Sequence, residues 1–125
     1  MIDHVSIAVR NLDKSAAAYE RVLATLGLRC LVVRESAVGF GKSYPEFWLN
    51  ARPSADPLPA GSGNHVCLRT IDEESVRAFH SAAVGCEFSD DGAPGPRHAE
   101  MNDYFGAFVR DSDGNRVEAA SFPKK

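Results

Sequence analysis

Long apolar runs, an excess of basic residues and a signal-peptide pattern are all missing from this chain of 125 residues. No stretch approaches the roughly 18 consecutive apolar residues that a membrane-spanning helix needs, and no basic segment followed by an apolar run opens the sequence. A net charge of −3 and a pI near 5.8 give no reason to expect a polyanionic partner. We therefore expect a cytoplasmic protein that binds neither nucleic acid nor membrane.

Paired cysteines are missing as well. The three cysteines are Cys30, Cys67 and Cys86, which lie far apart and form no CxxC pair. This spacing argues against a thiolate zinc site, and the odd number argues against a disulfide framework. We predict reduced, structural thiols. With 44% apolar and 25% charged residues, the chain has the composition and length of one globular domain.

The first 50 residues show the pattern of a strand, a helix and three more strands. Residues 2–9 alternate between apolar and polar side chains, which places His4 on the polar face of a strand. A helix with an apolar stripe follows, with Asn11 as its cap and Gly27 as its left-handed end. Three short β-like runs complete the unit, at residues 28–34, 37–40 and 46–49.

The same order repeats after a connection. Residues 51–63 are rich in proline and glycine and predict a linker. Residues 64–125 then open with a strand that carries His65 where the first unit carries His4, followed by a second amphipathic helix. A hairpin of residues 105–110 and 116–122, with Gly114 in its turn, closes the unit. We predict one α+β domain of two tandem βαβββ modules, residues 1–50 and 64–125.

Four segments of the chain together resemble the vicinal oxygen chelate superfamily, which includes glyoxalase I, bleomycin-resistance proteins, fosfomycin-resistance enzymes and extradiol dioxygenases. They are the opening DHVSIAV strand, the first helix and turn from Tyr19 to Leu28, the NHVCLR strand and the terminal DSDGNRVEAAS hairpin. The resemblance spans essentially the whole chain. It implies a half-open eight-stranded mixed sheet around a cleft, and a homodimer in which a second subunit completes or encloses that cleft.

Three side chains are candidate metal ligands. His4 and His65 open equivalent strands, and Glu118 lies on the polar face of the last strand. We expect pseudo-twofold symmetry to bring these faces together. Two imidazoles and a carboxylate suit one divalent ion, namely Fe, Mn, Ni, Co or Zn. From spacing alone the three residues are equally well explained as solvated or paired polar groups. The resemblance favours metal ligation, because they match its ligand positions.

The last strand of the first module departs from the glyoxalase I pattern. Glyoxalase I has a second carboxylate ligand there, whereas this chain has Trp48, with Glu46 two residues earlier on the same face. Tryptophan cannot bind a metal. Three protein ligands resemble the ring-cleaving dioxygenases instead, although those enzymes are usually longer. Neither named reaction fits fully.

Other residues are candidates for substrate binding and proton transfer. We interpret residues 89–104 as a lid, from which His98 and Tyr104 could move a proton or bind a substrate oxygen, while surface exposure of His98 and half-burial of Tyr104 are the simpler alternatives. Arg69, on the same strand face as His65, would favour an anionic substrate or pair with Glu118. Two aromatic residues could wall an apolar pocket or pack in the core, Phe40 and Trp48.

Two classes of function stay open on this basis. The first is a divalent-metal-dependent enzyme of lyase, isomerase or dioxygenase type that acts on a small oxygenated molecule. The second is a metal-free protein that binds or sequesters a small molecule, similar to the bleomycin-resistance members. The His-His-Glu set favours the enzyme, and Trp48 in place of a carboxylate favours the binding protein.

Overall fold

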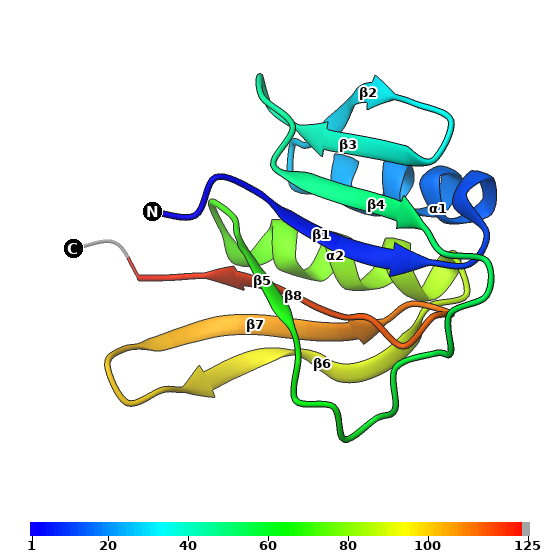
Figure 1. The fold of residues 1–125 in the computed structure, drawn as a ribbon. Helices are drawn as coiled ribbons and strands as arrows, with labels where there is room; N and C mark the ends of the chain where they lie inside the picture. Colours follow the sequence, from blue (N-terminus) through cyan, green and yellow to red (C-terminus); the bar gives the residue numbers. More distant parts are fainter. Residues whose placement is uncertain (124–125) are drawn as a thin grey trace.

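A computed structural model describes residues 1–123 of the chain (Figure 1). Two βαβββ modules follow one another, as predicted. The first module consists of β1 (Val5–Val9), α1 (Leu12–Ala24), β2 (Arg29–Val33), β3 (Ala37–Gly41) and β4 (Phe47–Ala51). The second consists of β5 (Val66–Arg69), α2 (Glu73–Gly85), β6 (Ser89–His98), β7 (Asp103–Arg110) and β8 (Arg116–Ser121).

The eight strands form two mixed sheets of four strands each, in the orders β1-β4-β3-β2 and β5-β8-β7-β6. In each sheet the first strand of the module runs parallel to the last, while the other neighbours are antiparallel. As a result β1 and β5 are both edge strands. His4 directly precedes β1 and His65 directly precedes β5, which confirms that the two histidines occupy equivalent places.

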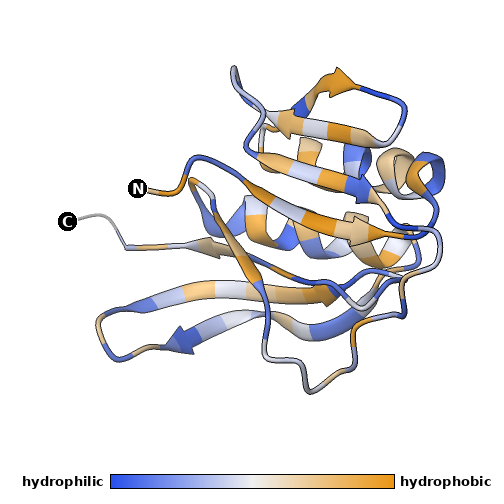
Figure 2. Cartoon of the chain, in the orientation of Figure 1, coloured by the Kyte–Doolittle hydropathy of each residue, from blue (hydrophilic) through white to orange (hydrophobic). Residues whose placement is uncertain are grey.

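Each helix packs on one face of its own sheet and leaves the other face open. Helix α1 contacts β2, β3 and β4, and α2 contacts β6, β7 and β8 (Figure 1). The two helices also contact each other, and one apolar core runs through both modules. Figure 2 shows apolar residues along the strands and helices of both modules. Within residues 1–123, neither helix has the length and apolar content required to cross a membrane.

The local signals in the sequence explain how the helices begin and end. The side chain of Asn11 accepts a hydrogen bond from the backbone of Lys14, so it caps α1 as predicted. Gly27 follows α1 with a φ of 78° and Gly114 has a φ of 83° in the last hairpin, which confirms both predicted left-handed positions. The predicted apolar stripe of the first helix is also confirmed as core: Tyr19, Val22, Leu23 and Leu26.

The prediction of a lid over residues 89–104 is wrong for most of its length. Residues 89–98 form strand β6, which pairs with β7, and only the turn at residues 99–102 separates the two strands. The prolines and glycines that suggested a loop are tolerated because β6 is an edge strand with two register shifts, where a missing N–H donor or an extra residue disrupts little pairing.

A buried polar cluster ties the last hairpin turn to the first module. Tyr19 in α1 donates a hydrogen bond of 2.7 Å to Asp111, and the Asn115 amide donates one of 2.8 Å to the backbone carbonyl of Ala8. Arg10 binds Asp113 at 2.7 Å. Burial raises the pKa of Asp111, while hydrogen bonds from Asn115 and Tyr19 oppose the rise. This cluster connects residues about a hundred positions apart and fixes how the two modules pack.

We predict that Tyr19→Phe lowers the free energy of unfolding by roughly 1–3 kcal/mol, because a buried carboxylate loses a hydrogen bond. Urea denaturation measures the change. The matched control is Tyr44→Phe, which also removes a Tyr–Asp hydrogen bond but on the surface, where Tyr44 donates to Asp3 at 3.1 Å. Its effect should stay within about 0.5 kcal/mol. Equal effects of the two substitutions would show that the Tyr19–Asp111 bond does not hold the modules together.

Candidate functional site

Polar and aromatic side chains gather on the open face of the second sheet, the face that α2 does not cover. Strand alternation brings them there from all four strands of the sheet. His65 directly precedes β5, and Cys67 and Arg69 lie in it. Strand β8 contributes Arg116 and Glu118, β7 contributes Tyr104 and Phe108, and β6 contributes Arg97.

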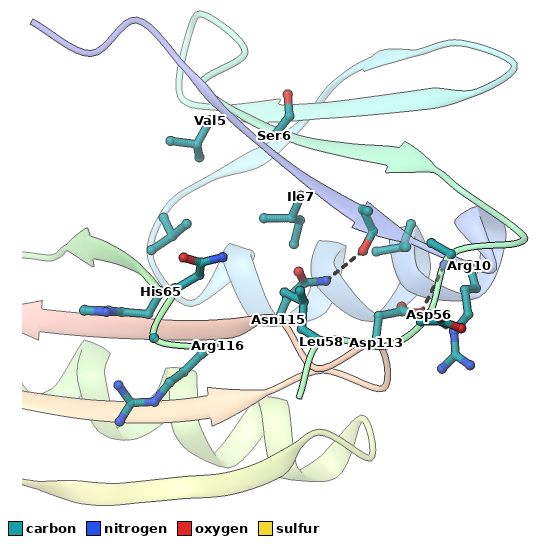
Figure 3. Close-up of a pocket in the computed structure, with 16 residues that line it drawn as sticks. Val5, Ser6, Ile7, Arg10, Asp56, Leu58, His65, Asp113, Asn115 and Arg116 are labelled. Atoms are coloured by element: carbon teal, nitrogen blue, oxygen red, sulfur yellow. Dashed lines mark hydrogen bonds and ion pairs between the residues drawn. The ribbon is translucent and has the colours of Figure 1, made fainter. Parts of the chain in front are cut away.

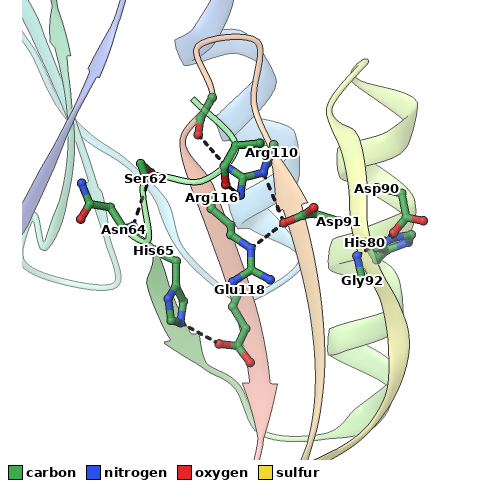
Figure 4. Close-up of polar contacts among 12 residues, drawn as sticks. Ser62, Asn64, His65, His80, Asp90, Asp91, Gly92, Arg110, Arg116 and Glu118 are labelled. Atoms are coloured by element: carbon green, nitrogen blue, oxygen red, sulfur yellow. Dashed lines mark hydrogen bonds and ion pairs between the residues drawn. The ribbon is translucent and has the colours of Figure 1, made fainter. Parts of the chain in front are cut away.

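His65 and Glu118 form the centre of this face (Figure 4). Nε2 of His65 lies 3.2 Å from Oε1 of Glu118, and Glu118 is only 2% exposed. Two ligand bonds of about 2.1 Å at roughly right angles place the donor atoms about 3 Å apart. A separation of 3.2 Å is therefore compatible with two ligands of one divalent ion, and it is also that of an ion pair between the two side chains.

Tyr104 lies against the other oxygen of the same carboxylate. Its hydroxyl donates a hydrogen bond of 2.6 Å to Oε2 of Glu118, and its ring stacks on Phe122. Gly106 makes this position possible, because an added Cβ would lie 2.9 Å from the tyrosine ring and 3.1 Å from Oε2. Burial and the hydrogen bond to Glu118 raise the pKa of Tyr104 to about 12, so the hydroxyl remains a donor at neutral pH.

Cys67 lies beside Glu118 on the same face, because the two residues are directly opposite each other in the β5–β8 register. Desolvation and the nearby Glu118 carboxylate raise the pKa of the Cys67 thiol to about 12. A thiol with this pKa is protonated at neutral pH and is a poor nucleophile. All three cysteines are free, in agreement with the prediction of reduced thiols.

Arginine side chains surround this centre. Arg116 and Arg110 both pair with Asp91, at 2.5 and 3.3 Å, and Figure 4 shows the single carboxylate between the two guanidinium groups. Arg116 also lies over the ring of Phe108, with 3.9 Å from its Cζ to the ring centroid. The predicted substrate residue Arg69 instead lies over Phe122 at 4.3 Å. The open face thus carries more positive than negative charge.

The open face of the first sheet holds the third predicted ligand. His4 lines a hollow of about 330 Å³ together with Trp48, Tyr44 and Arg34. Nδ1 of His4 is 2.7 Å from Asp3, and Arg34 lies over the Trp48 ring at 5.2 Å. Trp48 therefore occupies the cleft-facing position that the sequence predicts. Glu46, the alternative carboxylate, does not line this hollow.

A single chain does not assemble all three predicted ligands. Across residues 1–123 no group of three His, Cys, Asp or Glu side chains is placed to hold one ion. His65 and Glu118 lie together on the second sheet, whereas His4 lies on the first. The expectation that the two halves of one chain bring these faces together is therefore wrong. The reason is that the modules contact through their helices, on the sides away from the open faces.

A groove of about 810 Å³ links the two modules along the free edge of β1 (Figure 3). Residues of β1, the linker, the start of β5 and the last hairpin line it, and His65 and Arg116 are among them. Figure 3 shows Ser6 on the opposite side of β1 from Ile7. The groove therefore leads from the edge of the first sheet to the histidine of the second.

Two other predicted site residues lie elsewhere. Phe40 is fully buried and pairs in register with Phe47, so its ring belongs to the core, and it borders a hollow of about 290 Å³ that Cys67 and Arg69 also line. His98 is paired with Asp103 at 3.1 Å near the β6–β7 turn, with 82% of its side chain exposed. Strand alternation points it away from the face that carries Tyr104, which removes the basis for its proton-transfer role.

Two residues of the open face were not predicted from the sequence, Arg97 and Phe108. Arg97 lies opposite Tyr104 in the β6–β7 register, and its guanidinium lies 5.7 Å from the centroid of Phe108. Arg97 would have been found by extending the strand alternation through residues 89–98, had that segment been recognised as a strand, and Phe108 by following the alternation along the predicted strand of residues 105–110.

Comparison with solved structures gives the same architecture. A glyoxalase/bleomycin resistance protein from Albidiferax ferrireducens T118 matches with a TM-score of 0.84 and 26% identity, over 95% of this chain and 97% of that one. A glyoxalase/dioxygenase from Nostoc punctiforme matches with a TM-score of 0.70 and 17% identity, over 99% of this chain and 92% of that one.

A third similar structure contains a metal. It is a mutant of the fosfomycin-resistance protein FosX from Listeria monocytogenes, complexed with Mn(II) and 1S,2S-dihydroxypropylphosphonic acid. It matches with a TM-score of 0.69 and 14% identity, over 95% of this chain and 87% of that one, so the likeness is one of fold.

The family comparison covers almost the whole sequence. No curated protein matches the chain. The model of the glyoxalase/bleomycin resistance protein/dioxygenase superfamily, in contrast, matches residues 1–119. The match includes both modules and the candidate ligands His4, His65 and Glu118. This chain therefore belongs to the glyoxalase/bleomycin resistance protein/dioxygenase superfamily.

Proposed function

We propose that the protein is a divalent-metal-dependent enzyme that acts on a small oxygenated molecule, with lyase, isomerase or dioxygenase type chemistry. The observation that carries the proposal is the placement of His65 and Glu118, an imidazole and a carboxylate 3.2 Å apart on an open sheet face. A buried carboxylate is costly unless a cation or hydrogen-bond donors compensate it. A divalent ion would polarise neighbouring oxygens of a substrate as a Lewis acid.

We further propose that the active form is a homodimer. His4 and His65 both begin edge strands, and edge strands present unpaired backbone groups to another chain. A second copy that sets its first sheet against this second sheet would bring its own His4 to His65 and Glu118. Such a site has two imidazoles and one carboxylate and leaves coordination positions for substrate. The ion would be Fe, Mn, Ni, Co or Zn, and the Mn(II) in the FosX structure is in line with this proposal.

Tyr104 has a positioning role in this proposal. Through its hydrogen bond of 2.6 Å to Oε2 it orients Glu118, and such outer contacts tune the affinity of a metal site. The hydroxyl has a pKa of about 12 and so stays protonated, and its single proton is used in the bond to Glu118. Tyr104 is thus a positioning residue for the ligand, and its role in proton transfer or substrate binding stays a prediction.

A metal-free binding protein is the second candidate, and one observation favours it. Trp48 lines the 330 Å³ hollow of the first sheet with His4, and Gly39 beneath it leaves room for the indole, because an added Cβ would lie 3.0 Å from the ring. A half-buried aromatic ring in a hollow suits a flat aromatic ligand. In this case His4, His65 and Glu118 would be polar residues of the cleft. The cytoplasmic location stays a prediction in either case.

We predict that the purified protein binds close to one divalent ion per chain, and that His4→Ala, His65→Ala and Glu118→Gln each abolish this binding. Elemental analysis after loading with Fe(II), Mn(II), Ni(II), Co(II) or Zn(II) measures it, and thermal shifts report the stabilisation that binding adds.

The matched control is His80→Ala, because His80 pairs with Asp90 at 2.8 Å outside the site. That variant should retain the metal. If the wild type takes up no ion, or if His65→Ala retains it, the metal assignment is wrong and the binding protein becomes the preferred function.

We also predict that Tyr104→Phe weakens metal affinity by roughly 10-fold while leaving the stoichiometry unchanged, because outer-shell partners typically contribute on this scale. A competition titration with a coloured chelator measures the dissociation constant. The control is His98→Ala, since His98 is exposed and paired only with Asp103. An unchanged affinity in Tyr104→Phe would show that the tyrosine does not position the ligand.

A further inference from the structure

Arg97 is held in place by backbone atoms of its own strand. Its Nη2 donates a hydrogen bond of 2.7 Å to the carbonyl of Ala93, and its Nη1 donates one of 3.3 Å to the carbonyl of Pro96. The guanidinium also lies over Phe108. A side chain fixed in this way has lost much of its rotamer freedom before any ligand arrives, so binding through it costs less entropy.

Strand β6 is shaped around this guanidinium. Gly92 and Gly95 flank it, and an added Cβ would lie 3.2 Å from Nη2 at Gly92 and 3.3 Å from Nη1 at Gly95. Both glycines lie at register shifts of the β6–β7 pair. Bulges of this kind often redirect a side chain next to a site. The glycines of β6 therefore leave the space in which the Arg97 guanidinium lies on the open face.

Arg97 has spare donors and no acidic partner. Two backbone carbonyls take two of its five N–H groups, and within residues 1–123 no carboxylate lies at ion-pair distance from it. Arg110 and Arg116, in contrast, share Asp91. A fixed guanidinium with free N–H groups matches the geometry of a carboxylate or phosphate.

The charge on the whole face favours an anion as well. Four arginines stand against two carboxylates there: Arg69, Arg97, Arg110 and Arg116 against Asp91 and Glu118. A divalent ion at His65 and Glu118 would add further positive charge.

We propose that Arg97 is a specificity-determining residue, and that the substrate carries a carboxylate or phosphate-type anionic group bound by its guanidinium, separate from the oxygens that face His65 and Glu118. The proposal rests on the proposed function for its location, since it assigns a second contact to the same substrate. Anion binding by Arg97 is tested on metal-free protein. Its failure would therefore leave the metal-binding proposal open, and a failure to bind metal would leave this test valid.

The experiment is an NMR titration of metal-stripped, chelator-free protein at constant ionic strength, with inorganic phosphate, acetate and the neutral trimethyl phosphate as probes. Wild type should show saturable shifts with phosphate or acetate, including the Nε–H signal of Arg97, and none with trimethyl phosphate. In Arg97→Gln the dissociation constant should rise at least about 10-fold, the usual scale for a charge-assisted pair.

Arg52→Gln is the matched control, because Arg52 also donates only to a backbone carbonyl, that of Ala51 at 2.7 Å, but lies at the start of the linker. It should bind phosphate like wild type. The inference is overturned if wild type shows no saturable shift, if Arg97→Gln binds as tightly as wild type, or if Arg52→Gln weakens binding equally. Which of the two anions binds more tightly identifies the anionic group of the substrate.

Discussion

One helix can cover only one face of a four-stranded sheet, and this limit organises the molecule. In each module the helix buries the apolar face, so the side chains of opposite parity along every strand remain on an open face. Helix α1 packs on α2, and the cluster of Tyr19, Asp111 and Asn115 ties the last hairpin turn to the first module. The two open faces are therefore separate surfaces of the single chain.

The buried carboxylate of Glu118 shows how the second face is built. Both of its oxygens have a neighbour, His65 at 3.2 Å and Tyr104 at 2.6 Å, and Gly106 provides the space for the tyrosine. The carboxylate is thus held in one orientation by the chain itself, which is what the proposed metal site requires. Arg97 is seated in the same manner by Gly92 and Gly95. Glycines beneath functional side chains are thus a recurring feature of this sheet.

Strand and helix periodicity predicted most of the fold and part of the site. The alternation in residues 2–9 and 64–69 correctly placed His4 and His65 on equivalent polar faces. Strand β6 could not be predicted, because its prolines and glycines are tolerated only at a sheet edge, and sequence alone does not say which strand is the edge. Arg97 was missed for that reason. The sequence also predicted that His4 and His65 meet within one chain, whereas they lie on different sheets. This could not be foreseen, because the sequence symmetry of the modules does not specify which surfaces the helices cover.

The central claim is that the site combines the second sheet of one subunit with His4 of another. It is tested most directly by co-expressing His4→Ala and Glu118→Gln chains with different tags and isolating the mixed pair. The proposal requires that neither variant alone binds the ion and that the mixed pair recovers binding, because one of its two sites then contains His4, His65 and Glu118 intact. A mixed pair that assembles and still binds no metal would contradict it.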